Sequence, residues 1–255
     1  MRTKLLIFLL TAGLAFGTCA YSFAADGGSP VLVELFTSEG CSSCPPADVI
    51  LERMDSSQPV PGAHLIVLSE HVDYWNHDGW KDPYSSSLVT VRQQDYARKL
   101  GLKTVFTPQF IVDGTGQFVS NDPQQVIQTL EKAAASAKIP IQITSINFEN
   151  ATLHAHIEIP ASALKHDADI YFATALNHAD SQVLRGENSG KHLTHVAVVE
   201  NLTRVGKLKK NQPFNQDIQI KLHSGLDPQN LRVVVFVQEP GPGEVLGSAM
   251  QLVAK

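Results

Sequence analysis

Residues 31–48 of this chain read VLVELFTSEGCSSCPPAD, an apolar run followed by two cysteines and two prolines. The run at residues 31–36 is too uniformly apolar for a half-exposed strand, so it predicts a central strand covered on both faces. Pro45 then opens a predicted helix, since proline is favoured in the first helical turn. The apolar residues of that helix recur with helical spacing: Ala47, Ile50, Leu51 and Met54. Cys41 and Cys44 therefore lie where a buried strand turns into a helix.

The position of the two cysteines favours redox chemistry. At a helix start, backbone N–H groups and the helix dipole stabilise a thiolate, which is the attacking species. Cys41 is then the nucleophile, and Cys44 lies close enough to resolve a mixed disulfide. A structural disulfide remains an alternative, although a loop of about four residues gives only about 2 kcal/mol of loop-closure stabilisation. Half of a metal site is a second alternative, but structural zinc takes four ligands and the chain has no second C-x-x-C.

Further along the chain, the pattern predicts two different halves. After the first strand and helix, residues 65–68 predict a strand, 85–100 a helix, 109–112 and 117–119 a hairpin, and Asp122 caps a last helix. Beyond the join near residues 138–140 the chain shows short strands and turns without a convincing helix. Seven strands are predicted there: 139–148, 152–159, 170–176, 196–200, 214–222, 231–238 and 245–253.

The first half resembles the thioredoxin fold over residues 31–136. In that family a cis-proline begins the hairpin strand and faces the disulfide, and Thr107-Pro108 fits this position. The resemblance implies that Pro108 shapes the substrate groove beside Thr107. It also suggests Glu34, a buried acid on the preceding strand, as a proton acceptor for Cys44. The alternative for Glu34 is a carboxylate that simply finds a hydrogen-bond partner.

The fold class expected from these patterns is an α/β thioredoxin-like domain followed by an all-β immunoglobulin-like sandwich domain. The expected boundaries are residues 26–138 for the first domain and 139–255 for the second. His192 and His195, in the second half, follow a polar hairpin at residues 185–190 and are interpreted as exposed hairpin residues; the alternative is that this hairpin reaches the first domain.

A narrower resemblance connects the chain with a family of secreted bacterial thioredoxin-like proteins of unknown function. It rests on three blocks, namely residues 34–48, residues 71–75 together with 79–83, and Arg185-Gly186-Glu187-Asn188. The resemblance extends over most of the chain after its N-terminus, and the first two blocks are its most specific part. The resemblance implies a fold and a site, and does not imply a measured activity.

The N-terminus has the pattern of a secretory signal peptide, residues 1–24. Arg2 and Lys4 precede an apolar run at residues 5–16 and a small-residue stretch. A membrane anchor would need about 20 apolar residues. We therefore expect a periplasmic or secreted protein without a membrane span after signal removal. Cys19 would leave with the signal, and the remaining pair would meet an oxidising compartment.

Residues 71–84 form a long connection that contains both tryptophans of the chain, Trp75 and Trp80. The favoured interpretation is a packed aromatic loop that covers the cysteines and shapes the groove for a partner. The alternative is a copper or zinc site built from Cys41, Cys44 and His71.

Composition limits the function classes. The chain has 255 residues, 43% hydrophobic side chains, a formal charge of −5 and a pI near 6.0, which predict a globular protein and argue against a nucleic-acid partner. The leading hypothesis is an exported thiol–disulfide oxidoreductase that needs no cofactor and exchanges with protein thiols or disulfides. The alternatives are a copper or zinc carrier, and a non-catalytic binding module with a permanent disulfide.

Overall fold

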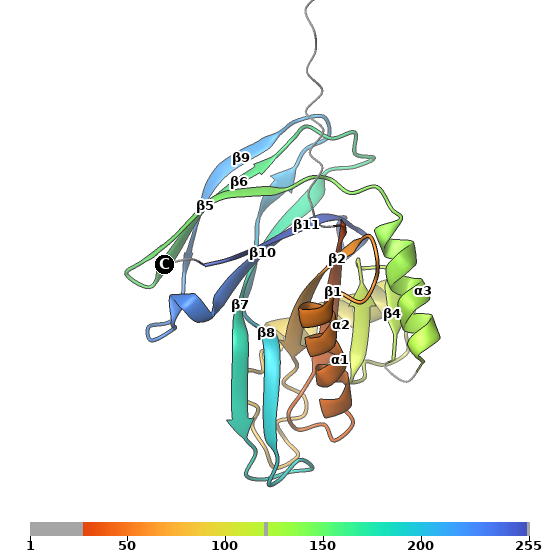
Figure 1. Ribbon diagram of the computed structural model, residues 1–255, viewed down its shortest axis with the longest axis vertical. Coiled ribbons are helices and arrows are strands. Elements are labelled where there is room, and N and C mark those ends of the chain that lie inside the picture. The colour runs from red at the N-terminus through yellow and green to blue at the C-terminus, as the bar shows by residue number, and fades with distance from the viewer. Residues whose placement is uncertain (1–27, 120–121, 254–255) are drawn as a thin grey trace, which may run out of the picture.

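One mixed sheet of eight strands forms the centre of the computed structural model, which describes residues 28–119 and 122–253 (Figure 1). The order across the sheet is β11-β10-β7-β8-β2-β1-β3-β4. A second sheet has the order β5-β6-β9, and the described residues contain three α-helices. The predicted signal peptide, residues 1–24, lies outside the described residues.

The first half supplies four neighbouring strands and all three α-helices of the described residues. The elements are β1 (Ser29–Thr37), α1 (Pro45–Ser57), β2 (Ala63–His71), α2 (Ser87–Leu100), β3 (Gln109–Val112), β4 (Gly116–Phe118) and α3 (Pro123–Ala134). β1 is parallel to β2 and antiparallel to β3. The predicted order of strand, helix, strand, helix, hairpin and helix is confirmed. Asp122 caps α3 as expected, because its side chain accepts the N–H groups of Gln124 and Gln125.

Alternating residues of β1 pack on opposite faces of the sheet. Val33 and Leu35 join the core cluster that contains residues of α1 and α3. Phe36 packs instead with Val89 and Tyr96 of α2. α1 and α3 therefore cover one face of this part of the sheet, and α2 covers the other. The uniformly apolar first strand follows from burial on both faces.

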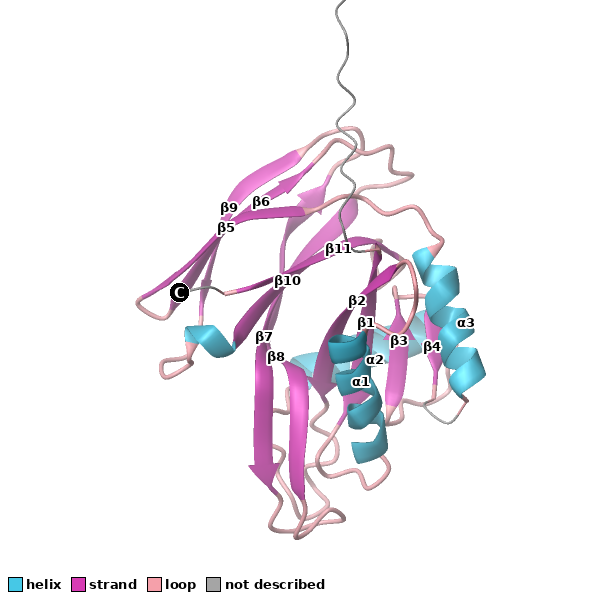
Figure 2. Ribbon diagram, viewed as in Figure 1, coloured by secondary structure: helices cyan, strands magenta, loops and turns pink. Residues whose placement is uncertain are grey.

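The second half supplies seven strands, as the pattern predicted. They are β5 (Gln142–Glu149), β6 (Thr152–Ile159), β7 (Ala168–Gln182), β8 (His192–Leu208), β9 (Phe214–Lys221), β10 (Leu231–Gln238) and β11 (Val245–Leu252), with a short 3₁₀ helix η1 (Pro228–Asn230) before β10. β5, β6 and β9 pack through an apolar core against β7 and β10. Figure 2 shows how strands dominate this half of the molecule.

The expected fold class, an α/β thioredoxin-like domain followed by a separate immunoglobulin-like sandwich, is wrong. β8 pairs in parallel with β2, through Ser69 and Val198, so that four strands of the second half continue the sheet of the first. One core cluster also contains Leu32 and Leu68 together with Phe236. The physical reason is that the α2-side face of β1 and β2 is apolar and is buried partly by strands from the second half.

The hairpin of β7 and β8 connects the two parts of the molecule. These are the two longest strands, with 15 and 17 residues. Their open end pairs with β10 and faces the three-stranded sheet, while their closed end extends beside α1, toward the bottom of Figure 1.

No helix in the described part of the chain is both long and apolar enough to cross a membrane.

Candidate functional site

The cysteine pair closes a small ring at the start of α1. Cys41 and Cys44 form a disulfide with Cα atoms 5.4 Å apart. Cys44 is the N-cap residue of the helix, and its N–H donates to the carbonyl of Cys41 over 3.2 Å. Pro45 and Pro46 follow and have no N–H to offer, which reduces the number of free donors at the helix start. Both cysteines are buried, with Cys41 1% and Cys44 0% exposed.

Three other predicted site residues surround Cys41. Its sulfur lies 3.8 Å from the carbonyl oxygen of Thr107, and the peptide bond from Thr107 to Pro108 is cis. The hydroxyl of Ser43 lies 3.2 Å from the same sulfur and is the donor, because a disulfide sulfur carries no proton. Trp75 donates its indole N–H to the Thr107 hydroxyl over 2.8 Å. The structure thus brings Cys41, Thr107, Pro108 and Trp75 together.

Trp75 also explains the glycine that precedes the first cysteine. A Cβ atom at Gly40 would lie 3.0 Å from the Cβ of Trp75, which is closer than side chains normally approach. Gly40 therefore allows the aromatic loop to pack directly onto the cysteine turn. Trp80 of the same loop donates its indole N–H to Glu39 over 2.7 Å.

The closed end of the β7–β8 hairpin covers the cysteine turn from the other side. Asn188, which is fully buried, donates from Nδ2 to the carbonyls of Glu39 at 2.8 Å and Cys41 at 3.0 Å. Glu187 accepts the N–H of Ser42 over 3.0 Å. Hydrogen bonding from the Ser42 side chain and from this N–H lowers the pKa of Glu187. Ser42 lies between the two cysteines, so residues about 145 positions away in the chain line the candidate site.

A buried cluster of acids and histidines lies behind the cysteine turn, on the α1 face of the sheet. His195 of β8 contacts Glu39 at 3.2 Å, and its other ring nitrogen lies 3.8 Å from Asp48 of α1. The rings of His195 and His71 meet edge to face with centroids 4.7 Å apart. His71 binds Asp82 over 2.8 Å. The cluster ties the first turn of α1 to β2 and β8.

Charge and burial act against each other inside this cluster. Burial raises the pKa of Asp48, although His195, His71 and the hydroxyl of Thr37 act to lower it. Burial alone would lower the pKa of His71, but Asp82 and the neighbouring carboxylates raise it above its usual value. Burial would raise the pKa of Asp82, but the pairing with His71 lowers it. Both pKa shifts favour the charged forms of His71 and Asp82, beside the carboxyl group of Asp48, which holds its proton more tightly than usual.

Glu34 lies apart from this cluster, on the α2 face of the sheet. Its carboxylate accepts Arg92 Nε over 2.6 Å and the Tyr96 hydroxyl over 2.5 Å. Since α1 lies on the opposite face, these contacts direct Glu34 away from the cysteine turn. The hydrogen-bond alternative considered for Glu34 matches this geometry.

The sequence did not indicate several residues at the site. His195 was interpreted as exposed, yet it is buried, whereas His192 is exposed as expected. Asn188 and Asp48 were noticed only inside the blocks of the family resemblance. The role of Asn188 depends on contacts between distant segments, which no local spacing predicts, whereas Asp48 lies one helical turn after Cys44.

Metal ligation has limited support in the described part of the chain. Residues 28–119 and 122–253 contain no group of three or more His, Cys, Asp or Glu side chains arranged to hold a metal ion. His71, the histidine of the copper or zinc alternative, has one ring nitrogen bound to Asp82 and its Nε2 without a partner among these residues.

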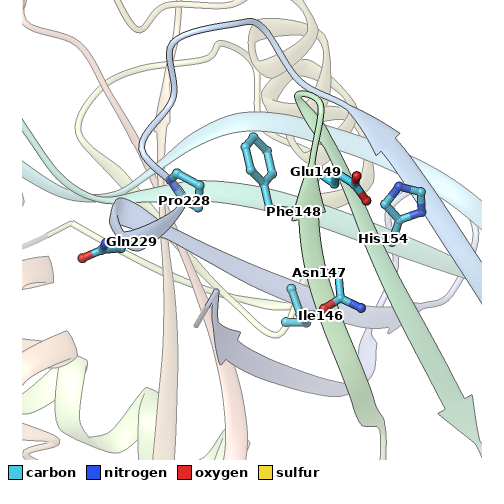
Figure 3. A pocket seen from close by; sticks show the side chains of 7 residues that line it. All are labelled: Ile146, Asn147, Phe148, Glu149, His154, Pro228 and Gln229. Carbon is cyan, nitrogen blue, oxygen red and sulfur yellow. The ribbon is translucent and has the colours of Figure 1, made fainter. Parts of the chain in front are cut away.

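A separate hollow of about 680 Å³ lies on the three-stranded sheet side of the molecule (Figure 3). It is lined by Ile146, Asn147, Phe148, Glu149, His154, Pro228 and Gln229, which come from β5, β6 and η1. None of its seven lining residues is fully buried. No element that lines it contributes a residue to the cysteine site, so the hollow is not part of that site.

Comparisons with known proteins place the chain in a family of unknown function and find solved structures with a similar fold. One family model, described as a protein of unknown function (DUF1223), matches residues 32–238. The crystal structure of a structural-genomics target from Agrobacterium tumefaciens is 27% identical, with a TM-score of 0.71, and the match covers 91% of this chain and 97% of that chain. HBP35 of Porphyromonas gingivalis is 15% identical, with a TM-score of 0.67 over 89% of this chain and 76% of that one, a likeness that shows the fold alone. No curated protein matches the chain.

Proposed function

Since the chain belongs to this family of unknown function, we propose its activity from the site itself: an exported thiol–disulfide oxidoreductase that uses Cys41 and Cys44. The observation that carries the proposal is the disulfide at the start of α1, with Cys41 beside the Ser43 hydroxyl and the Thr107 carbonyl. A disulfide across two residues adds only about 2 kcal/mol by loop closure, which makes it a weak structural link. The N-terminal signal pattern supports export into a compartment where disulfides persist.

The exchange balances in two steps. A partner thiolate attacks the sulfur of Cys41, the bond between Cys41 and Cys44 breaks, and Cys44 leaves as a thiolate that takes up a proton. A second partner thiolate then attacks the partner sulfur of the mixed disulfide, and Cys41 leaves and is protonated in turn. The partner loses two electrons and two protons, which the cysteine pair gains. The reverse sequence reduces a partner disulfide.

We assign Asp48 as the group that exchanges a proton with the Cys44 thiol. It lies one helical turn after Cys44, with its N–H bonded to the Cys44 carbonyl over 3.1 Å, and residues four apart share a helix face. Burial raises the pKa of Asp48, which brings it nearer to that of a thiol. Glu34, suggested for this role by the thioredoxin resemblance, is instead bound by Arg92 and Tyr96 on the opposite face.

A redox titration by thiol trapping tests the proposal. The Cys41–Cys44 pair should equilibrate with a glutathione or dithiothreitol buffer, whereas a reduction potential below about −300 mV would indicate a structural disulfide. Cys41→Ser should abolish disulfide exchange with a model protein substrate. Cys44→Ser should instead accumulate a mixed disulfide at Cys41, because the resolving thiol is missing. Undiminished exchange by Cys41→Ser would refute the assignment.

A further inference from the structure

The buried disulfide raises a question of access. Exchange needs a thiolate to approach Cys41 in line with the bond that breaks, yet Cys41 and Cys44 are 1% and 0% exposed. The turn between them is different, because Ser42 and Ser43 are both exposed. A partner can therefore reach the surface of the turn but cannot reach the sulfur atoms unless a covering segment moves.

The segment from Val183 to Lys191, which we call the hairpin tip, is attached to the cysteine turn by three hydrogen bonds. Two come from the Asn188 amide to the carbonyls of Glu39 and Cys41, and one joins the Glu187 carboxylate to the N–H of Ser42. All three use backbone groups of the turn itself. A chain that approached the disulfide would meet these same groups, so the tip occupies part of the surface that a partner needs.

The remainder of the hairpin tip is weakly attached. Residues 184–187 are exposed, and so are Ser189 and Gly190. Only Val183 and Asn188 are buried within the segment. Gly186 has a φ of +76° and packs against the loop of residues 78–80, where a Cβ atom would lie 3.1 Å from the carbonyl oxygen of Asp78. A mostly exposed turn that is held to the cysteine turn by the side chains of Asn188 and Glu187 is suited to local release without unfolding of the sheet.

We propose that the hairpin tip is a latch over the disulfide, that Asn188 is its main fastening, and that a partner must displace it before its sulfur reaches Cys41. The inference rests on the proposed function only in taking Cys41 as the attacked sulfur. The partner is a polypeptide thiol or disulfide whose flanking chain takes over the freed groups, namely the Ser42 N–H and the carbonyls of Glu39 and Cys41. The second half of the chain then controls access to chemistry that the first half performs.

The latch predicts faster reduction when its fastening is removed. Asn188→Ala deletes both donors to the turn, and two ordinary hydrogen bonds correspond to about 30-fold in the balance between closed and open tip. The second-order rate of disulfide reduction by dithiothreitol should therefore rise at least about tenfold. Glu187→Ala should raise the same rate about threefold, since this bond is exposed to water. Because Glu187 is exposed, its removal tests the latch even where Asn188→Ala is poorly folded.

Matched controls lie on the same hairpin. Ser189→Ala changes the neighbouring residue, whose hydroxyl donates to the Leu184 carbonyl within the tip. Asp180→Ala removes a carboxylate that pairs with His192 on the strands. Both controls should reduce at the wild-type rate. The proposal is overturned if Asn188→Ala and Glu187→Ala stay within twofold of wild type, or if the controls accelerate as much as they do. Because dithiothreitol measures access alone, this result is independent of whether a physiological redox partner exists.

Discussion

Arg92 is the residue whose replacement should most directly show that the two halves of the chain form one cooperative unit. Its guanidinium lies on the α2 face and binds Glu34 of β1 at 2.6 Å. From the second half, Gln238 Oε1 accepts a hydrogen bond from the guanidinium at 3.2 Å. The rings of Tyr171 and Phe236, also from the second half, lie with their centroids 5.4 and 5.3 Å from the guanidinium carbon of Arg92. One side chain thus holds partners from both halves.

The expected cost of Arg92→Met follows from what the substitution leaves behind. Glu34 is fully buried, and without Arg92 it retains the Tyr96 hydroxyl as its hydrogen-bond donor and faces Glu70. Removing one partner of a buried ion pair costs about 3–5 kcal/mol, because the other charge stays buried without compensation. For a chain of this size that corresponds to a fall in Tm of roughly 10 °C. Glu34→Gln combined with Arg92→Met should cost less than the two single changes added together.

Urea unfolding followed by two probes measures this effect. Tryptophan fluorescence reports on the first half, which contains both Trp75 and Trp80, whereas far-ultraviolet circular dichroism reports on the backbone structure of both halves. Both transitions should shift together to lower urea. Arg204→Met is the control, since Arg204 is 55% exposed and pairs with Asp169 at 3.3 Å, so it should cost less than about 1 kcal/mol. A loss below about 1 kcal/mol for Arg92→Met, or a shift in the fluorescence transition alone, would show that the halves are independent.

Two further predictions concern single carboxyl groups. Burial and the neighbouring Glu34 raise the pKa of Glu70 well above its usual value, so ionisation of Glu70 opposes folding as pH rises above about 4.5, and the opposition grows until the folded-state pKa is passed. Glu70→Gln should therefore stabilise the protein more at pH 8 than at pH 5 in urea titrations, and an equal gain at both would contradict this assignment. The Glu187 carboxylate accepts the Ser42 N–H next to Cys41, and its negative charge there disfavours a Cys41 thiolate. Glu187→Gln keeps a hydrogen-bond acceptor but removes the charge, so it should lower the pKa of that thiol in the reduced protein, measured by ultraviolet thiolate absorbance; an unchanged or higher thiol pKa would count against it.

The order of helices and strands was predictable because each element carries its own local pattern. The proline after Cys44, the capping Asp122 and the apolar run of β1 all act within a few residues. The pairing of β2 with β8 was not predictable in this way. An apolar strand shows that its faces are buried, but its pattern does not specify which strand completes its hydrogen-bonded edge. The error in fold class therefore arose at one edge of one strand.

The residues of the candidate site also differ in whether local sequence could indicate them. Cys41 and Cys44 are recognisable because their spacing is local. Thr107 was placed beside them through the thioredoxin resemblance, and Trp75 through the interpretation of residues 71–84 as a loop that covers the cysteines. Asn188 has no local signal, since a buried amide that binds the carbonyls of a turn 147 residues away resembles any polar turn residue in sequence. Residues of this kind become visible only when distant segments are seen together.

The alternation of β1 separates two polar clusters that the sequence could not distinguish. Glu34 and Glu39 are both buried acids close to Cys41 in sequence, but Glu34 points to the α2 face and binds Arg92, whereas Glu39 meets His195 and Trp80 beside the cysteine turn. The first cluster joins the halves of the sheet through a buried ion pair, and the second surrounds the groups that exchange would use. Because His195 and the hairpin tip both come from the second half, the redox site proposed here is complete only when the β7–β8 hairpin is docked against α1. The second half is thus a structural part of the candidate site, and the pairing of β8 with β2 is what positions it there.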